Sequence, residues 1–186
     1  MLMPTRPETA AAEPVFLRSM ELADLDRSHR WHNDPELYRT LVGGFRFVSR
    51  VAEEEWLRRR IAYSTAEINL AVCRAGDCEH VGNVYLRDID WVSRNAGLHL
   101  LIGEPAQRGK GYGQSALRQI MRHAQADLGL ARLYLYVLEE NAPARRIYEK
   151  CGFVVEGKLR RHVFKEGRFQ DLLLMGWCVA DSGEKA

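Results

Sequence analysis

One glycine-rich segment of the chain, from Arg108 to Gly113, has the residue types and spacing of a phosphate-binding turn. It follows a short apolar, strand-like run, residues 97–102, and precedes a segment in which apolar residues recur at helical spacing. Glycine lets the backbone approach a ligand closely, and the start of a helix offers unpaired N–H groups and the positive end of its dipole. This turn therefore predicts a pyrophosphate-binding site, to which Arg108 and Lys110 add positive charge.

The spacing of the three glycines excludes the commoner phosphate loops. Gly109, Gly111 and Gly113 alternate, whereas a dinucleotide fingerprint requires G-x-G-x-x-G, and Lys110 is not followed by the Ser or Thr of a P-loop. A flexible basic turn without a ligand remains the alternative for this hexapeptide taken alone. The binding interpretation assigns every residue of the turn to the ligand site: Arg108, Gly109, Lys110, Gly111, Tyr112 and Gly113.

A second segment, Asn141 to Phe153, has polar and small residues at helical spacing. Asn141 is a good N-cap, and the proline that follows is tolerated in a first helical turn. Asn141, Ala144 and Tyr148 would then share one face of the helix, and the small Ala144 would let a ligand pass. Taken alone, Tyr148 is better explained as a core aromatic. Together with the glycine turn, the spacing favours a ligand-binding face.

Both segments resemble motifs of the GNAT superfamily of N-acetyltransferases. Arg108 to Gly113 fits R-x-x-G-x-G, and Asn141 to Phe153 fits N-x-x-A-x-x-x-Y-x-K-x-G-F. Outer segments, such as Trp31 to Pro35, are similar to the RimJ/RimL-like branch, so that the resemblance covers residues 15–178. It implies a GNAT-like mixed α/β fold: a mostly antiparallel sheet of about seven strands with about four helices, splayed at the acyl-CoA site.

The resemblance also implies how acetyl-CoA, the co-substrate, is held. In this family the strand before the glycine turn diverges from its neighbour, and here that strand ends at Leu101, Ile102 and Gly103. Its free backbone groups would pair with the pantetheine arm, and one N–H would polarise the acetyl carbonyl.

The same resemblance assigns roles on the second segment. The Asn141 side chain would contact pantetheine beside Ala144, and the Tyr148 hydroxyl would protonate the leaving thiolate. A phenol with a pKa of about 10 is protonated at pH 7 and can act as this acid.

The general base is less well defined by the sequence. Some relatives carry a glutamate on the strand after the glycine-turn helix, and the matching position here is Tyr136. A water chain could remove the proton instead. Glu104 is taken as the catalytic base, and the full set of candidates is Glu104, His99, Asp90, Glu36 and Asp171.

Composition bounds the class of protein. The chain has 186 residues, a net charge of +2 and no apolar run near the ~20 residues of a membrane span, so we expect neither nucleic acid nor membrane as a partner. Four cysteines without a C-x-x-C pair indicate reduced thiols and a cytoplasmic protein. His29 and His32 are three residues apart but have no third ligand, so no metal site is expected.

The organisation along the chain predicts one domain, residues 14–179, between a disordered N-terminal tail, 1–13, and a polar C-terminal tail, 180–186. The expected strands are 15–18, 68–73, 80–86, 97–102, 133–137, 153–164 and 169–177; the expected helices are 22–32, 50–63, 112–128 and 142–150. Basic residues crowd the final hairpin, where they favour protection of an edge strand over recognition of an anionic acceptor. That hairpin or an exposed sheet edge could also form a homodimer.

The sequence thus favours an acetyl-CoA-dependent N-acetyltransferase that modifies a primary amine. The acceptor is either a protein N-terminus or a small amine, such as an amino sugar, an aminoglycoside or a polyamine. A non-catalytic acyl-CoA sensor is the alternative, although a pure binder has no need of the acid Tyr148.

Overall fold

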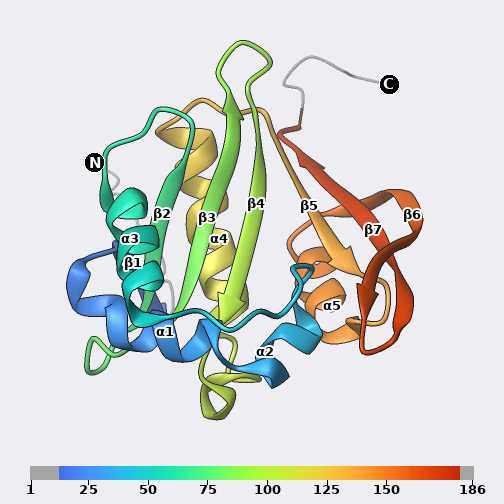
Figure 1. Cartoon of the computed structure of the whole chain (residues 1–186). Coiled ribbons are helices and arrows are strands. Elements are labelled where there is room, and N and C mark those ends of the chain that lie inside the picture. The colour runs from blue at the N-terminus through green and yellow to red at the C-terminus, as the bar shows by residue number, and fades with distance from the viewer. Residues whose placement is uncertain (1–12, 181–186) are drawn as a thin grey trace, which may run out of the picture.

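The computed structural model describes residues 13–180, so the predicted tails fall almost wholly outside the described residues. These residues form a seven-stranded sheet, as predicted, and helices lie on both of its faces (Figure 1). The strands are β1 Val15–Ser19, β2 Ile68–Arg74, β3 His80–Asp90, β4 Asn95–Ile102, β5 Arg132–Leu138, β6 Val154–Lys165 and β7 Arg168–Cys178. The α-helices are α1 Leu25–His32, α2 Pro35–Thr40, α3 Arg50–Ile61, α4 Tyr112–Ala126 and α5 Ala142–Lys150, with 3-10 turns at Leu22–Asp24 and Pro105–Gln107.

The sheet opens between β4 and β5, which are its central parallel pair. The strand order is β1-β2-β3-β4-β5-β7-β6, and every other neighbouring pair is antiparallel. β4 and β5 are paired only from Asn95↔Arg132 to Gly97↔Tyr134, whereas β5 pairs with β7 along its whole length. Residues 98–102 therefore present one backbone edge that has no strand partner within residues 13–180, so that backbone donors and acceptors are available there. The predicted splay is confirmed.

Alternation along β4 places its side chains in two different layers. Leu98 packs in the cluster that includes Leu117 and Ile120 of α4, whereas Leu101 packs against the cluster with Leu57 of α3. Helices α4 and α5 thus cover one face of the sheet, and α1 to α3 cover the other (Figure 1). The open edge of β4 is reached between these two layers.

One helix was missed by the sequence analysis, so five α-helices stand within residues 13–180 where about four were expected. The first helix ends at His32, before Asn33, as predicted, but α2 begins at Pro35 after only two intervening residues. The Asp34 side chain accepts a hydrogen bond from the Glu36 N–H at 2.9 Å, and Pro35 occupies the first helical position. Asp-Pro is therefore both the stop of α1 and the start signal of α2.

Helices α3 and α5 begin directly after capping residues. Ser49 and Asn141 accept hydrogen bonds from the N–H groups of Ala52 and Ala144, as N-caps do. The glycine-turn helix was expected to run to residue 128, but α4 ends at Ala126, and Gly129 follows in the connecting turn with a left-handed φ of +65°.

Candidate active site

The glycine turn joins the open strand β4 to the start of α4. Gly109 and Gly111 have φ values of +75° and +82°, a backbone conformation that residues other than glycine rarely adopt. Gly111 is the N-cap of α4 and provides no side-chain cap, and the first turn carries no acidic residue. The first N–H groups of a long helix therefore lack intrahelical partners beside an exposed basic loop, which is the geometry of an anion site.

Arg108 closes this turn onto the end of β4. Its guanidinium donates to the Ile102 carbonyl at 3.1 Å and to the Gly103 carbonyl at 3.0 Å. Lys110 donates to the Gln107 side chain at 3.1 Å. Arg108 therefore fixes the loop as well as supplying charge, and its predicted contact with pyrophosphate remains a prediction.

Gly103 is needed where β4 passes beneath α1. Its N–H donates to the Val81 carbonyl at 2.9 Å, and a Cβ added there would lie 2.1 Å from the Trp31 indole. The indole is itself buried, at 3% exposure. No side chain larger than hydrogen fits without moving α1 or β4.

We expect Gly103→Ala to lower the free energy of unfolding by about 1–3 kcal/mol, because the added methyl overpacks the Trp31 contact. Urea unfolding would measure this loss. Gly44→Ala is the matched control, since nothing lies within 4 Å of a Cβ there. If Gly103→Ala were as stable as the parent, the requirement for glycine at this position would be contradicted.

Tyr148 lies on α5, and its ring belongs to the main core. The residue is 8% exposed and its ring centroid is 5.9 Å from that of Phe153. Burial raises the pKa of Tyr148 to about 12, so the hydroxyl is protonated at neutral pH. Burial is the sole cause of this shift, and no hydrogen bond within residues 13–180 engages the hydroxyl. Tyr148 is thus a core aromatic with a free proton donor at its tip.

Both polar atoms of the Asn141 side chain are hydrogen-bonded to the backbone. Its oxygen accepts from the Ala144 N–H at 3.1 Å, and its nitrogen donates to the Thr40 carbonyl at 2.9 Å. It therefore ties the start of α5 to the end of α2. Its predicted contact with pantetheine, and the passage of a ligand beside the half-buried Ala144, remain predictions.

Glu104 is held by α1 at the start of the glycine turn. It accepts a hydrogen bond from Trp31 Nε1 at 3.0 Å and forms an ion pair with Arg30. Burial acts to raise the pKa of Glu104, but the hydrogen bonds from Trp31 and Arg30 outweigh it and lower that pKa below its usual range. A carboxylate stabilised in this way is a weak base.

Of the other candidate bases, three carboxylates have hydrogen-bond or ion-pair partners within the protein, and the fourth candidate is a histidine. Asp90 holds the β3–β4 turn through Ser93, Asp171 accepts from the Arg161 N–H, and Glu36 pairs with Arg39. His99 pairs in register with Tyr85, on the face of β4 covered by α1 to α3. Burial, with a smaller contribution from the charge of Arg87, lowers the pKa of His99.

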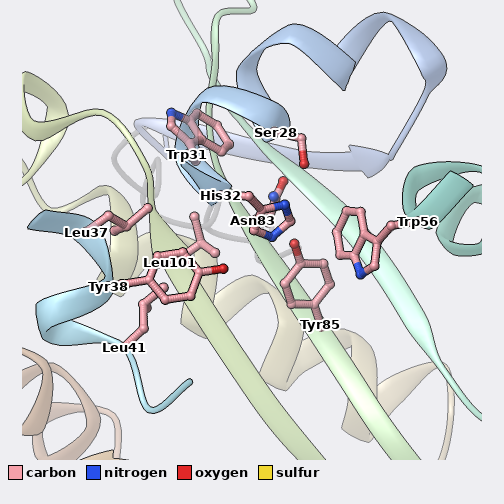
Figure 2. A pocket seen from close by; sticks show the side chains of 10 residues that line it. All are labelled: Ser28, Trp31, His32, Leu37, Tyr38, Leu41, Trp56, Asn83, Tyr85 and Leu101. Carbon is pink, nitrogen blue, oxygen red and sulfur yellow. The ribbon is translucent and has the colours of Figure 1, made fainter. Parts of the chain in front are cut away.

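A cavity of about 80 Å³ lies on that face, between β3, β4 and the first three helices. Figure 2 shows its lining of aromatic, leucine and a few polar side chains. The lining residues are Ser28, Trp31, His32, Leu37, Tyr38, Leu41, Trp56, Asn83, Tyr85 and Leu101. Because Leu101 belongs to β4, the cavity borders the strand that carries the open edge.

One pair of residues beside this cavity was not found from the sequence. Glu53 of α3 is 1% exposed, and its carboxylate accepts from Ser28 Oγ at 2.5 Å and pairs with His32 Nδ1 at 2.6 Å. His32 had been weighed only as a metal ligand. A signal was present, because Glu53 precedes the buried Leu57 by four residues and so shares its inward helical face.

Three basic side chains of the final hairpin, those of Lys158, Lys165 and Arg168, are engaged within the protein. β6 is an edge strand, as expected. Lys158 pairs with Glu139, and Arg168 pairs with Glu140. Lys165 is 8% exposed and donates to the carbonyls of Tyr38 and Gly43, which fastens the hairpin to the α2–α3 connection. This pairing favours a structural role over recognition of an anionic acceptor.

Two further findings concern residues 13–180. No group of three or more His, Cys, Asp or Glu side chains is placed to hold a metal ion there. Within the same range, no helix combines the length and apolar character needed to cross a membrane. The four cysteines are free thiols.

Comparison with known proteins gives consistent matches. A family described as "Acetyltransferase (GNAT) domain" matches residues 15–154. The spermidine N(1)-acetyltransferase of Vibrio cholerae is 36% identical over 95 residues, which span 51% of this chain and about half, 54%, of that enzyme. A crystal structure of spermidine N-acetyltransferase from Vibrio cholerae with CoA and spermine has a TM-score of 0.83 at 29% identity, over 90% of this chain and 96% of that one. A dodecameric structure of the enzyme has a TM-score of 0.76 at 29% identity, over 90% and 95%.

Proposed function

Because the chain belongs to the acetyltransferase (GNAT) family, we propose that it transfers the acetyl group of acetyl-CoA to a primary amine of a small, polyamine-like acceptor. The observation that carries this proposal is the position of the open β4 edge, which leads directly into the glycine turn. The likeness to spermidine acetyltransferases supports the acceptor class. A protein N-terminus is the second acceptor class raised by the sequence, and the RimJ/RimL-like placement remains a prediction.

The proposed reaction proceeds by direct transfer in a ternary complex. Backbone N–H groups of the glycine turn and the start of α4 hold the pyrophosphate, and the free edge of β4 pairs with pantetheine as a further strand would. A β4 N–H aimed at the acetyl oxygen would stabilise the negative charge that develops there when the amine attacks. Tyr148 then gives its hydroxyl proton to the departing CoA thiolate.

The test of the function is a screen of amines with acetyl-CoA, in which released thiol is counted and each product is examined for the mass of one added acetyl group. We expect spermidine or a related amine to be acetylated in proportion to thiol release. Binding of acetyl-CoA without thiol release from any amine would instead support the sensor alternative.

Assembly and location form a finer part of the proposal. We infer that the protein forms at least a homodimer, since the similar Vibrio cholerae enzyme has a dodecameric structure, and that it works in the cytoplasm, where free thiols persist. Light scattering at micromolar concentration would measure the assembly, and a monomeric mass would contradict it.

A further inference from the structure

We infer that His32, oriented by the buried carboxylate of Glu53, accepts the proton that the acceptor ammonium must lose before it attacks acetyl-CoA. The inference rests on the proposed function, because it names the base for that reaction. An alkylammonium ion has no lone pair for attack, so its proton must go to another group. A positioned general base typically contributes about 10²–10⁴-fold in rate.

The hydrogen bonds of Glu53 decide which nitrogen of His32 is free. An ionised carboxylate only accepts hydrogen bonds, so the 2.6 Å contact places the imidazole proton on Nδ1. The Nε2 lone pair is then available to accept a proton. The second oxygen of Glu53 accepts from Ser28 Oγ, which fixes the carboxylate and with it the plane of the imidazole.

The position of His32 allows a substrate to reach it. Its side chain is 20% exposed, and its ring lies edge-on to Trp56, with a centroid distance of 4.8 Å. Figure 2 shows the imidazole among the side chains that line the cavity, with the Tyr85 hydroxyl directed toward the same interior. Because Leu101 of β4 lines the same cavity, the base and the strand predicted to hold the thioester share one compartment.

The cavity is also built to receive a polar group. Tyr85 is 6% exposed, and its hydroxyl has no hydrogen-bond partner within residues 13–180. The nearby Asn83 oxygen is taken by His80 Nε2 at 2.8 Å. An unpaired buried hydroxyl is unfavourable, so Tyr85 favours an occupant that can donate to its oxygen, as an ammonium can.

The groups around His32 carry charges of both signs. On neighbouring elements they are the Glu53 carboxylate, the phenols of Tyr38 and Tyr85, which are neutral at physiological pH, and the guanidinium groups of Arg60 and Arg87 on the rings of Trp56 and Tyr85. Burial raises the pKa of both tyrosines and the Glu53 charge adds to this effect in each case, whereas the charges of Arg87 and Arg60 oppose it at Tyr85. Arg87 lies 4.7 Å from the Tyr85 ring centroid and Arg60 5.4 Å from that of Trp56, and both pair with Glu67. Glu53 is therefore the group beside His32 that attracts an ammonium ion.

His29 provides an internal contrast on the same helix. Its Nε2 lies 2.9 Å from the Val48 carbonyl, so it donates there and holds the segment before α3. Although both histidines stood out in the sequence, only His32 combines a carboxylate partner with a place on the cavity wall.

The protons balance across the proposed step. The acceptor ammonium gives one proton to His32 Nε2, directly or through one water, and becomes a neutral amine that attacks the acetyl carbon. The C–S bond breaks, the thiolate takes the Tyr148 proton, and the proton lost by the new amide nitrogen restores the phenol. His32 then releases its proton to solvent, which leaves acetylated amine, CoA and one proton.

The test compares the pH dependence of kcat/KM, with acetyl-CoA and the best amine of the screen, for the parent and His32→Gln. Glutamine can still donate to Glu53, so folding should survive, and a retained rise in melting temperature with acetyl-CoA would verify it. We expect kcat at neutral pH to fall by at least about tenfold and the low-pH limb of the profile to move or vanish. His123→Gln, at an exposed site near the end of α4, should keep the parent profile.

Two further variants sharpen the test. Glu53→Gln should also change the low-pH limb, because Glu53 acts only through His32, while the KM for acetyl-CoA stays unchanged. In His32→Ala, added imidazole should restore part of the lost rate. Parent-like turnover and an unmoved limb in His32→Gln would overturn the inference, whereas a parent that acetylates no amine would overturn the proposed function itself.

Discussion

Replacing Tyr148 by phenylalanine should lower kcat by at least about tenfold while acetyl-CoA affinity changes little. The ring is retained, so its contact with Phe153 and the rest of the core stays intact. Only the hydroxyl is lost, and with it the proton for the leaving thiolate. General-acid loss typically costs about 10²–10⁴-fold, and partial protonation by water sets the lower limit. Steady-state kinetics at saturating acetyl-CoA would measure the change.

The matched control for this variant is Tyr63→Phe, because Tyr63 is 93% exposed and lies just beyond α3. It removes the same atom from a tyrosine outside the site and should leave kcat unchanged. If Tyr148→Phe also turns over like the parent, Tyr148 is a core aromatic alone, and the acid is solvent or another group.

Gly111→Val should abolish the rise in melting temperature that acetyl-CoA produces in the parent. A ligand that binds only the folded state stabilises it by mass action, so the rise reports binding directly. Gly111 has a left-handed φ of +82° as the N-cap of α4. A branched side chain is strained there and also projects beside the N–H groups that would face the pyrophosphate.

Strain alone would lower stability without touching the ligand, so a second glycine separates the two effects. Gly129→Val imposes similar strain, because Gly129 has a φ of +65° and, like Gly111, no neighbour within 4 Å of a Cβ. Gly129 follows the C-terminal end of α4, whereas the glycine turn precedes its N-terminal end. Gly129→Val should lose stability but keep its response to acetyl-CoA. A response retained in Gly111→Val would show that the glycine turn is not the cofactor site.

The parts of the fold that the sequence predicted are those fixed by local chemistry. Glycines at positive φ, the caps Ser49 and Asn141, and helical spacing after Gly113 act within a few residues of the structure they specify. Such signals located the glycine turn and the helix that carries Tyr148. Asp34-Pro35 signals both the end of one helix and the start of the next. The sequence analysis interprets it only as the end of α1, so α2 is not predicted.

The remaining features depend on which distant segments meet. The divergence of β4 from β5 exists because β5 pairs along its length with β7, and a family resemblance was needed to expect it. The His32–Glu53 pair joins residues 21 positions apart through the packing of α1 against α3. In the sequence Glu53 stands in a run of three glutamates, and burial distinguishes it from the next two, whose side chains are 40% and 64% exposed and pair with Arg58 and Arg59.

The central claim is that acetyl-CoA lies along the open edge of β4 with its thioester at Tyr148. A crystal structure of the complex with CoA tests it most directly. We predict the pyrophosphate on the N–H groups of residues 109–113, the pantetheine arm between β4 and β5, and the sulfur within hydrogen-bonding reach of Tyr148 Oη. CoA bound away from the glycine turn, or a sulfur directed away from Tyr148, would contradict it.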